Sequence, residues 1–148
     1  SLVELATDTG RTDPVTVQRL MALRAKRQVN EWNGQRAKAA LENGTSSPVA
    51  SLGKLAMSDI LHTAGSLQTE ILGAEGTIGG MDSPRSADAT YSLLNAFFTS
   101  IGGGTDQIQR NIIGERLLGL PKEPSVDRDL AFRDVPKAAT TRTDDTAR

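Results

Sequence analysis

Hydrophobic residues recur at spacings of three and four along most of the chain, which is the period of an amphipathic helix. The first such segment covers residues 14–43, with Asp13 placed to cap its start and Pro14 at its first helical position. The second covers residues 48–72, with Ser47 as its expected cap. Its apolar stripe consists of Leu52, Ala56, Ile60, Ala64, Leu67 and Ile71. The pattern therefore predicts two long helices joined by a short turn.

Two shorter segments follow. Residues 88–100 predict a third helix, although the aromatic residues Tyr91, Phe97 and Phe98 are also compatible with a strand. Residues 105–118 predict a fourth helix that is closed by a glycine. No segment alternates apolar and polar residues over a sustained length. The predicted fold is therefore all-α, an antiparallel four-helix bundle.

The two ends of the chain differ in character. Residues 1–135 are predicted to form one helical domain, and residues 136–148, which carry no large apolar side chain, are predicted to be a disordered tail. Ser1 leads directly into the sequence without an initiator methionine or a signal-peptide pattern. We interpret this start as a cut through a longer chain.

Composition narrows the possible functions. The 17 basic and 18 acidic residues nearly balance, so charge gives no reason to expect a nucleic acid or an anionic membrane as a partner. No apolar run approaches the roughly 20 residues of a membrane span. The absence of cysteine excludes disulfides, thiolate metal sites and a cysteine nucleophile, and favours a cytoplasmic location. The single histidine, His62, cannot form a zinc site alone and is interpreted as a surface or packing residue.

The stretch FFTSIGGGTDQIQRNIIGERLLG, residues 97–119, places three glycines directly before a helix. Glycine lets another group approach the backbone closely, and a helix start offers free N–H groups. Thr105 is placed to cap this helix, and Gln107 adds a polar group. Asp106 would repel a phosphate, whereas the hydroxyl groups of a ligand would tolerate it. From the residues alone, a tight turn with an ordinary cap is the simpler interpretation.

Two motifs favour a ligand-binding role for this loop over a simple turn. The run GGGTDQIQRNIIGERLLGLP resembles the C-terminal signature of the flavin-dependent acyl-CoA dehydrogenases, and ILGAEG at residues 71–76 resembles the ILGGNG-type loop of that family. The two long helices before them match the family's C-terminal four-helix domain. The resemblance covers residues 17–120 well and residues 2–16 loosely.

The resemblance implies an enzyme that oxidises an acyl-CoA thioester to its trans-2-enoyl form. A carboxylate removes the α-proton while the β-hydride passes to FAD, and the electrons leave through an electron-transfer flavoprotein. The intact protein would also contain an N-terminal helical domain and a middle β-domain, and would assemble as a dimer or tetramer. This chain alone is therefore expected to be inactive.

The resemblance also assigns site residues. The flavin-contacting positions at the start of the last helix fall on Thr105, Asp106 and Gln107. The loop that approaches the adenosine half of FAD, usually across a subunit boundary, falls on Glu70, Ile71, Leu72, Gly73 and Ala74. The acyl substrate would pass Gly103 and Gly104. Two departures stand out: Glu70 and Ala74 replace the usual Gln and Gly, and the family's upstream Arg-x-x-Phe-Gly stretch is missing, with Ala6 and Thr9 nearest to it.

No residue of this chain is assigned as a catalyst. In many family members the residue two before the threonine is the catalytic Glu, but here it is Gly103. Other members supply the base from an earlier helix, which would lie before Ser1. Three hypotheses follow: the C-terminal domain of an acyl-CoA dehydrogenase, a non-catalytic dehydrogenase-like subunit that serves assembly, and an unrelated helical interaction module.

Overall fold

The computed structural model describes residues 1–45, 49–78, 83–122 and 130–135, and within them the chain is helical without a strand. This confirms the predicted all-α class. The α-helices are α1 (Leu2–Asp8), α2 (Pro14–Glu42), α3 (Val49–Leu72), α4 (Pro84–Ile101) and α5 (Asp106–Ile112). Short 3₁₀ helices cover Gly73–Thr77 (η1) and Phe132–Asp134 (η3), and a π-helical turn, Ile113–Leu117 (η2), extends α5. The predicted disordered tail, residues 136–148, lies outside the described residues.

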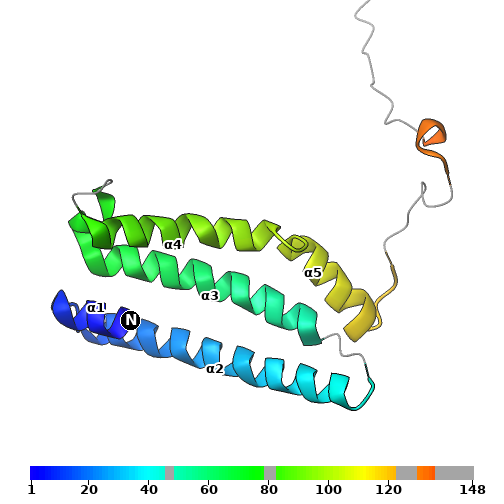
Figure 1. Cartoon of the computed structure of the whole chain (residues 1–148), viewed down its shortest axis with the longest axis horizontal. Coiled ribbons are helices and arrows are strands. Elements are labelled where there is room, and N and C mark those ends of the chain that lie inside the picture. The colour runs from blue at the N-terminus through cyan, green and yellow to red at the C-terminus, as the bar shows by residue number, and fades with distance from the viewer. Residues whose placement is uncertain (46–48, 79–82, 123–129, 136–148) are drawn as a thin grey trace, which may run out of the picture.

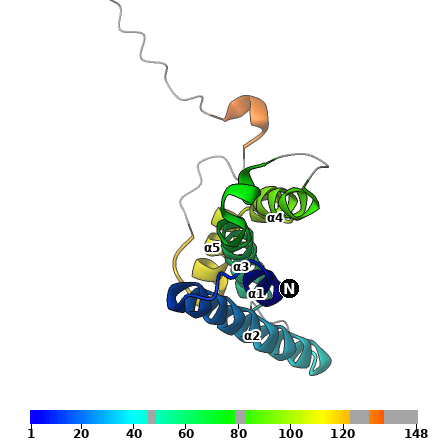
Figure 2. The same cartoon turned by 90° about the vertical axis from the view of Figure 1, so that its left-hand side faces the viewer.

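Helix α3 lies at the centre of the molecule. Helices α2, α3 and α4 run side by side in alternating directions, and α5 continues from α4 after a short break (Figure 1). Seen end-on, α3 lies between α2 and α4 (Figure 2). It packs against α1, α2, α4 and α5. One face of α4 is therefore turned toward α3 and the opposite face is turned outward.

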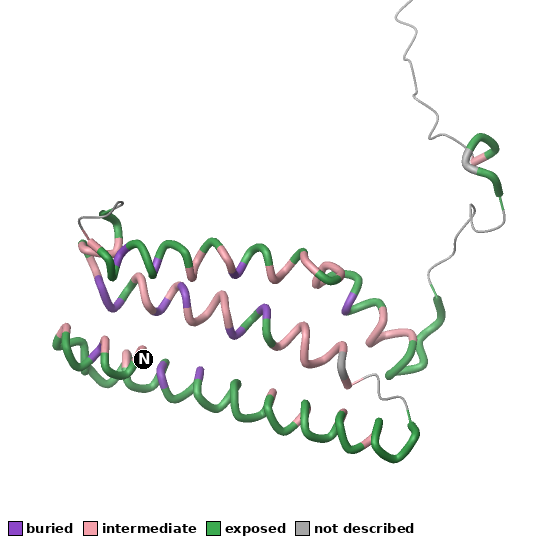
Figure 3. Tube along the Cα trace, viewed as in Figure 1, coloured by how far each residue is buried: buried purple, intermediate pink, exposed green. Residues whose placement is uncertain are grey.

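The start of α2 forms as its sequence predicts. The Asp13 carboxylate accepts hydrogen bonds from the backbone N–H groups of Val15 and Thr16, both at 3.1 Å. The predicted stripe of α3, with Leu20 and Leu23 of α2 and Ala6 of α1, supplies the hydrophobic core. Its other buried members are Ile60, Leu67 and Ile71 (Figure 3). These few side chains hold α1 and α2 against α3.

One helix and one helix boundary differ from the prediction. Helix α1 was not predicted, although Ser1 and Glu4 form a complete capping box at its start. Helix α4 begins at Pro84, four residues earlier than expected, with Ser83 before it. The strand alternative for this segment is wrong. The expected Ser47 cap of α3 lies outside the described residues.

Helices α3 and α4 approach each other very closely. A Cβ atom added at Gly65 in α3 would lie 2.8 Å from the Leu93 Cα atom of α4. The facing side of α4 is built from small residues, and Ser86, Ala89 and Ala96 are all fully buried. Because these side chains are small, α4 contributes little hydrophobic volume to the core and its larger apolar residues lie elsewhere on the helix.

Among the described helices, none combines the length and the apolar character that crossing a bilayer requires.

Candidate functional site

The break between α4 and α5 contains the three glycines. Gly103 and Gly104 have φ angles of +68° and +94°, a region that side-chain-bearing residues rarely adopt. Thr105 then caps α5, because its hydroxyl oxygen accepts a hydrogen bond of 3.3 Å from the backbone N–H of Ile108. The sequence therefore uses glycine here to end α4 and lead the backbone into α5 within a few residues.

The two glycines with positive φ differ in their surroundings. A Cβ atom at Gly104 would lie 3.0 Å from Nε2 of the buried Gln109, which donates a 3.3 Å hydrogen bond to the Gly103 carbonyl oxygen. A Cβ atom at Gly103 would meet nothing within 4 Å. In the described part of the chain, the backbone N–H groups of Gly103 and Gly104 donate no hydrogen bond. Gly104 is thus explained by packing, whereas Gly103 leaves an open approach to the backbone.

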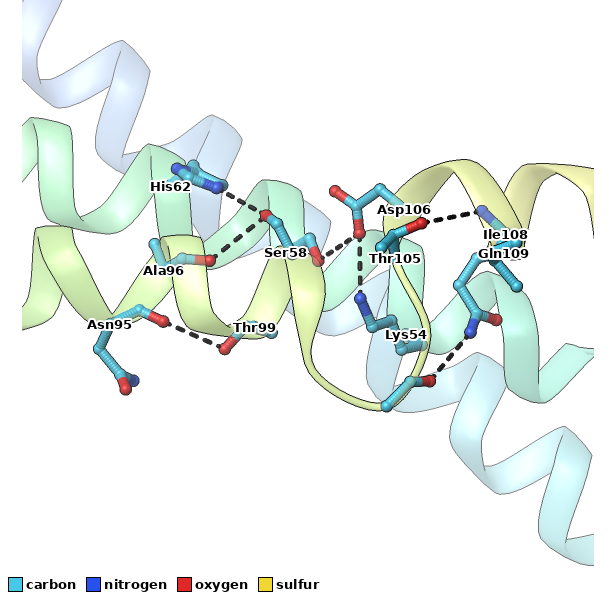
Figure 4. A network of polar contacts seen from close by, with 12 residues as sticks. Lys54, Ser58, His62, Asn95, Ala96, Thr99, Thr105, Asp106, Ile108 and Gln109 are labelled. Atoms are coloured by element: carbon cyan, nitrogen blue, oxygen red, sulfur yellow. Dashed lines mark hydrogen bonds and ion pairs between the residues drawn. The ribbon is translucent and has the colours of Figure 1, made fainter. Parts of the chain in front are cut away.

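The Asp106 side chain is turned toward α3. Its Oδ1 atom accepts hydrogen bonds from the Ser58 hydroxyl at 2.7 Å and from Lys54 Nζ at 3.1 Å (Figure 4). Ser58 is buried, and the side chains of Lys54 and Asp106 are only 21% and 18% exposed. These contacts fix the start of α5 to the middle of α3 and hold the glycine loop in place.

The charge of Asp106 is compensated within the chain. Burial alone would raise the pKa of its carboxyl, but the hydrogen bonds from Ser58 and Lys54, together with the positive charge of Lys54, outweigh burial and lower the pKa below its usual value. A carboxylate that stays ionised and engaged in this way is a weak proton acceptor. From the sequence alone, Asp106 was expected to repel a phosphate. The positive charge of Lys54 offsets that repulsion.

His62 packs against α4. Its Nε2 atom lies 2.8 Å from the Ser100 hydroxyl oxygen (Figure 4). Its ring meets the Phe97 ring edge-on at a centroid distance of 4.7 Å. The Ser100 hydroxyl also donates to the Ala96 carbonyl. These contacts support a packing role for His62.

The second predicted loop lies at the end of α3. The Glu70 carboxylate pairs with Arg19 of α2, and the hydrogen bond from Arg19 followed by its charge lowers the pKa of Glu70. Ile71 and Leu72 are buried, so their side chains serve the core. Gly73 has a φ of +60°, and Ala74 is exposed. Only Glu70, Ala74 and the local backbone remain accessible to a ligand in this chain.

A single chain does not bring the two predicted loops together. Residues 70–74 lie near the N-terminal end of α4, and residues 103–107 follow its C-terminal end (Figure 1). Helix α4 has 18 residues, which corresponds to a length of about 27 Å. The two sets of residues therefore form two separate surfaces at opposite ends of one helix.

The polar contacts of α3 were missed by sequence reasoning. Lys54, Ser58 and His62 are spaced by four residues, so they form a polar row along one side of α3. That spacing was a usable signal for a polar contact with another helix. The partner could not be found in the same way, because Asp106 is 48 and 52 positions away from Ser58 and Lys54. Among the described residues, no cluster of His, Asp or Glu could hold a metal ion.

We expect Asp106→Asn to lower the free energy of unfolding by about 1 kcal/mol at neutral pH, because Lys54 loses its charged partner in a partly buried place. The pKa of Asp106 is lower in the folded chain than in the unfolded chain, so its stabilisation is present above about pH 4 and is lost as the pH falls through the folded value. Urea unfolding of both proteins at a series of pH values measures this difference.

The control for this prediction is Asp59→Asn, which removes the exposed pair between Lys26 and Asp59. An exposed pair contributes little, so this variant should remain close to the parent chain. An equal loss in both variants, or a difference for Asp106→Asn that persists unchanged into acid, would contradict the assigned role of the Asp106 contacts.

Comparison with known proteins agrees with the resemblance found in the sequence. Residues 7–118 match the family model described as "Acyl-CoA dehydrogenase, C-terminal domain". A curated protein of Mycobacterium tuberculosis named "Acyl-CoA dehydrogenase IpdE1" is 30% identical over 132 residues, which cover 83% of this chain and 31% of that relative. The chain thus spans about a third of the length of the curated relative it matches. No solved structure gives a significant match.

Proposed function

This chain belongs to the acyl-CoA dehydrogenase family, as a C-terminal helical domain, and on that premise we propose that it is part of a flavoenzyme that oxidises an acyl-CoA thioester to the trans-2-enoyl-CoA. The observation that carries the proposal is the loop between α4 and α5. Gly103 leaves the backbone open to a ligand, Thr105 caps α5, and Asp106 holds the loop at a fixed place on α3. Open, left-handed glycines also occur at Gly10, Gly44 and Gly119, so the feature that distinguishes this loop from those turns is the pair of contacts that hold Asp106 to α3.

The residues of this loop are compatible with the cofactor that the family generally uses, FAD, which accepts the hydride in such a reaction. The unpaired backbone N–H groups of Gly103 and Gly104 offer donors to a polar ligand, and Gln107 is exposed beside them. Asp106 would contribute to FAD binding only indirectly. Its carboxylate accepts hydrogen bonds from α3 and thereby orients the loop. At the other end of α4, Glu70, Gly73 and Ala74 would present backbone and polar groups to the adenosine half.

The substrate would approach at Gly103 and Gly104, where a side chain would obstruct it. Removal of the α-proton requires a carboxylate near this open space. Asp106 is unsuited to the task because its carboxylate is engaged by Ser58 and Lys54 on α3 and its lowered pKa makes it a weak base. We assign the base to a helix that precedes Ser1 in the parent protein.

The remaining parts of the proposal concern the whole protein. Its electrons would pass to an electron-transfer flavoprotein, its subunits would assemble as a homo- or hetero-oligomer, and it would act in the cytoplasm. The second candidate function is a non-catalytic dehydrogenase-like subunit, which Gly103 favours because it replaces the glutamate that many family members carry there. A carboxylate on the preceding helix of the parent protein distinguishes the first function from the second.

We expect the isolated chain to bind FAD weakly or not at all. In the resembled family, the flavin ring lies between this domain and the β-domain, so most of the surface that would bury it is missing here. Fluorescence titration of FAD with the purified chain measures the affinity. A purified chain that retains one tightly bound FAD would contradict the expectation, and a parent protein that binds none would contradict the proposed function.

A further inference from the structure

The short helix η1, which follows α3, carries an acidic side chain, Glu75, that is tied to the start of α4. The Oε1 atom of Glu75 accepts hydrogen bonds from Arg85 Nε and from the Ser83 hydroxyl, both at 3.1 Å. Its Oε2 atom accepts a hydrogen bond of 2.9 Å from Arg85 Nη2. Arg85 lies in the first turn of α4, and Ser83 directly precedes that helix. We call the contacts of Glu75 with Ser83 and Arg85 the Glu75 clasp.

The Glu75 clasp fixes the orientation of η1 as well as its position. The planar guanidinium of Arg85 binds both carboxylate oxygens of Glu75, and such a bidentate pair restricts the two side chains more than a single contact does. The side chains of Glu75 and Arg85 are 31% and 54% exposed. Ion pairs that are this open to water contribute little to the free energy of unfolding. The clasp is therefore expected to act on the geometry of η1 more than on the stability of the chain.

Two further contacts place η1 and the residue after it against the long helices. A Cβ atom added at Gly76 would lie 2.8 Å from the Thr69 carbonyl oxygen of α3, so η1 approaches the α3 backbone closely. The hydroxyl of the fully buried Ser86 in α4 donates a hydrogen bond to the Ile78 carbonyl oxygen. The segment is thus held by α3 on one side and by α4 on the other.

The part of η1 that would face a ligand comes directly before Glu75. Gly73 has a φ of +60° and Ala74 is exposed, so both can present backbone groups to a bound molecule. No side chain caps the start of η1. Because Glu75 is the next residue in the chain, its contacts with α4 determine where the backbone of Gly73 and Ala74 lies.

We propose that Glu75 is a positioning residue for the adenosine half of FAD and that the Glu75 clasp gives the parent protein a stronger preference for FAD over FMN. This inference rests on the proposed function, in which Glu70, Gly73 and Ala74 face the adenosine half. FMN carries the flavin ring without adenosine, so its binding makes no use of that surface. FAD gains affinity from a surface that is already in its bound geometry, because no binding free energy is then spent on ordering it.

The test compares FAD and FMN binding to the flavin-free parent protein and to its Glu75→Gln variant. Glutamine keeps the size of the side chain but removes its charge and one of the two acceptors of the bidentate pair. We expect the dissociation constant of FAD to rise by about tenfold and that of FMN to change by less than about twofold. Urea unfolding of the flavin-free proteins should show little difference in stability between the variant and the parent protein.

The matched control is Glu42→Gln, which removes the exposed pair between Lys38 and Glu42 in α2 and should leave both dissociation constants unchanged. Reversing the pair, with Glu75→Arg and Arg85→Glu together, should recover part of the FAD affinity that Arg85→Glu alone removes. An unchanged FAD affinity in Glu75→Gln, or an equal loss for FAD and FMN, would overturn the positioning role while the proposed function stands. A parent protein that binds neither flavin would contradict the proposed function, and the inference would fall with it.

Discussion

Replacing the proposed catalytic carboxylate of the parent protein by its amide is expected to reduce dehydrogenation by about 10²–10⁴-fold. The reason lies in the residues around Gly103. The glycines themselves hold no proton acceptor, and the carboxylate that follows them in the sequence, Asp106, is fixed by Ser58 and Lys54 with a lowered pKa. We therefore place the acceptor of the α-proton on the helix that precedes Ser1 in the parent protein. The rate of enoyl-CoA formation by the variant and by the parent protein measures the effect.

Two controls make this result specific. The visible flavin spectrum of the variant should be unchanged, because the amide removes a proton acceptor without removing a flavin contact. Introducing Gly103→Glu into the same variant should restore no more than a small part of the activity. Many family members carry Glu there and an added Cβ atom meets nothing within 4 Å, but the φ of +68° strains any residue with a side chain and the new side chain would stand in the path proposed for the substrate. Full activity of the amide variant, or the absence of an acidic residue on the preceding helix, would refute the assignment of the catalytic base. The non-catalytic dehydrogenase-like subunit would then be the favoured function.

Gly65→Ala is expected to lower the free energy of unfolding by about 2 kcal/mol. The added methyl group would lie 2.8 Å from the Leu93 Cα atom, and a backbone contact can be relieved only if α3 and α4 move apart. The matched control is Gly34→Ala in α2, where the new methyl group meets nothing within 4 Å. That variant should gain up to about 1 kcal/mol from its better helix propensity. Urea unfolding of both variants measures the contrast, and a stabilised Gly65→Ala would show that the two helices are not in close contact.

The fold was predictable to the extent that its signals are local. Asp13 and Pro14 mark the start of α2, and the stripe containing Ile60 and Leu67 identifies the buried side of α3. The start of α4 at Pro84 was missed because the run of large apolar residues begins later, at Tyr91. That run lies on the outward face, so apolar periodicity described a surface of α4 that this chain does not bury.

The site was predictable only in part. The left-handed glycines and the Thr105 cap follow from a short stretch of sequence, and both are present. The Asp106 contacts depend on the packing of α5 against α3, which no local pattern specifies. The separation of the two predicted flavin loops likewise follows from the length of α4 and from its direction. A resemblance assigns residues to a cofactor one by one, but the distances between those residues come from the fold.

The most direct measurement is an anaerobic titration of the purified parent protein with a panel of saturated acyl-CoA thioesters, followed by flavin absorbance. We predict that the parent protein carries bound FAD, that at least one thioester bleaches the absorbance of the oxidised flavin, and that the matching trans-2-enoyl-CoA is found as product. A parent protein that contains no flavin and forms no enoyl-CoA with any thioester would contradict the proposed function.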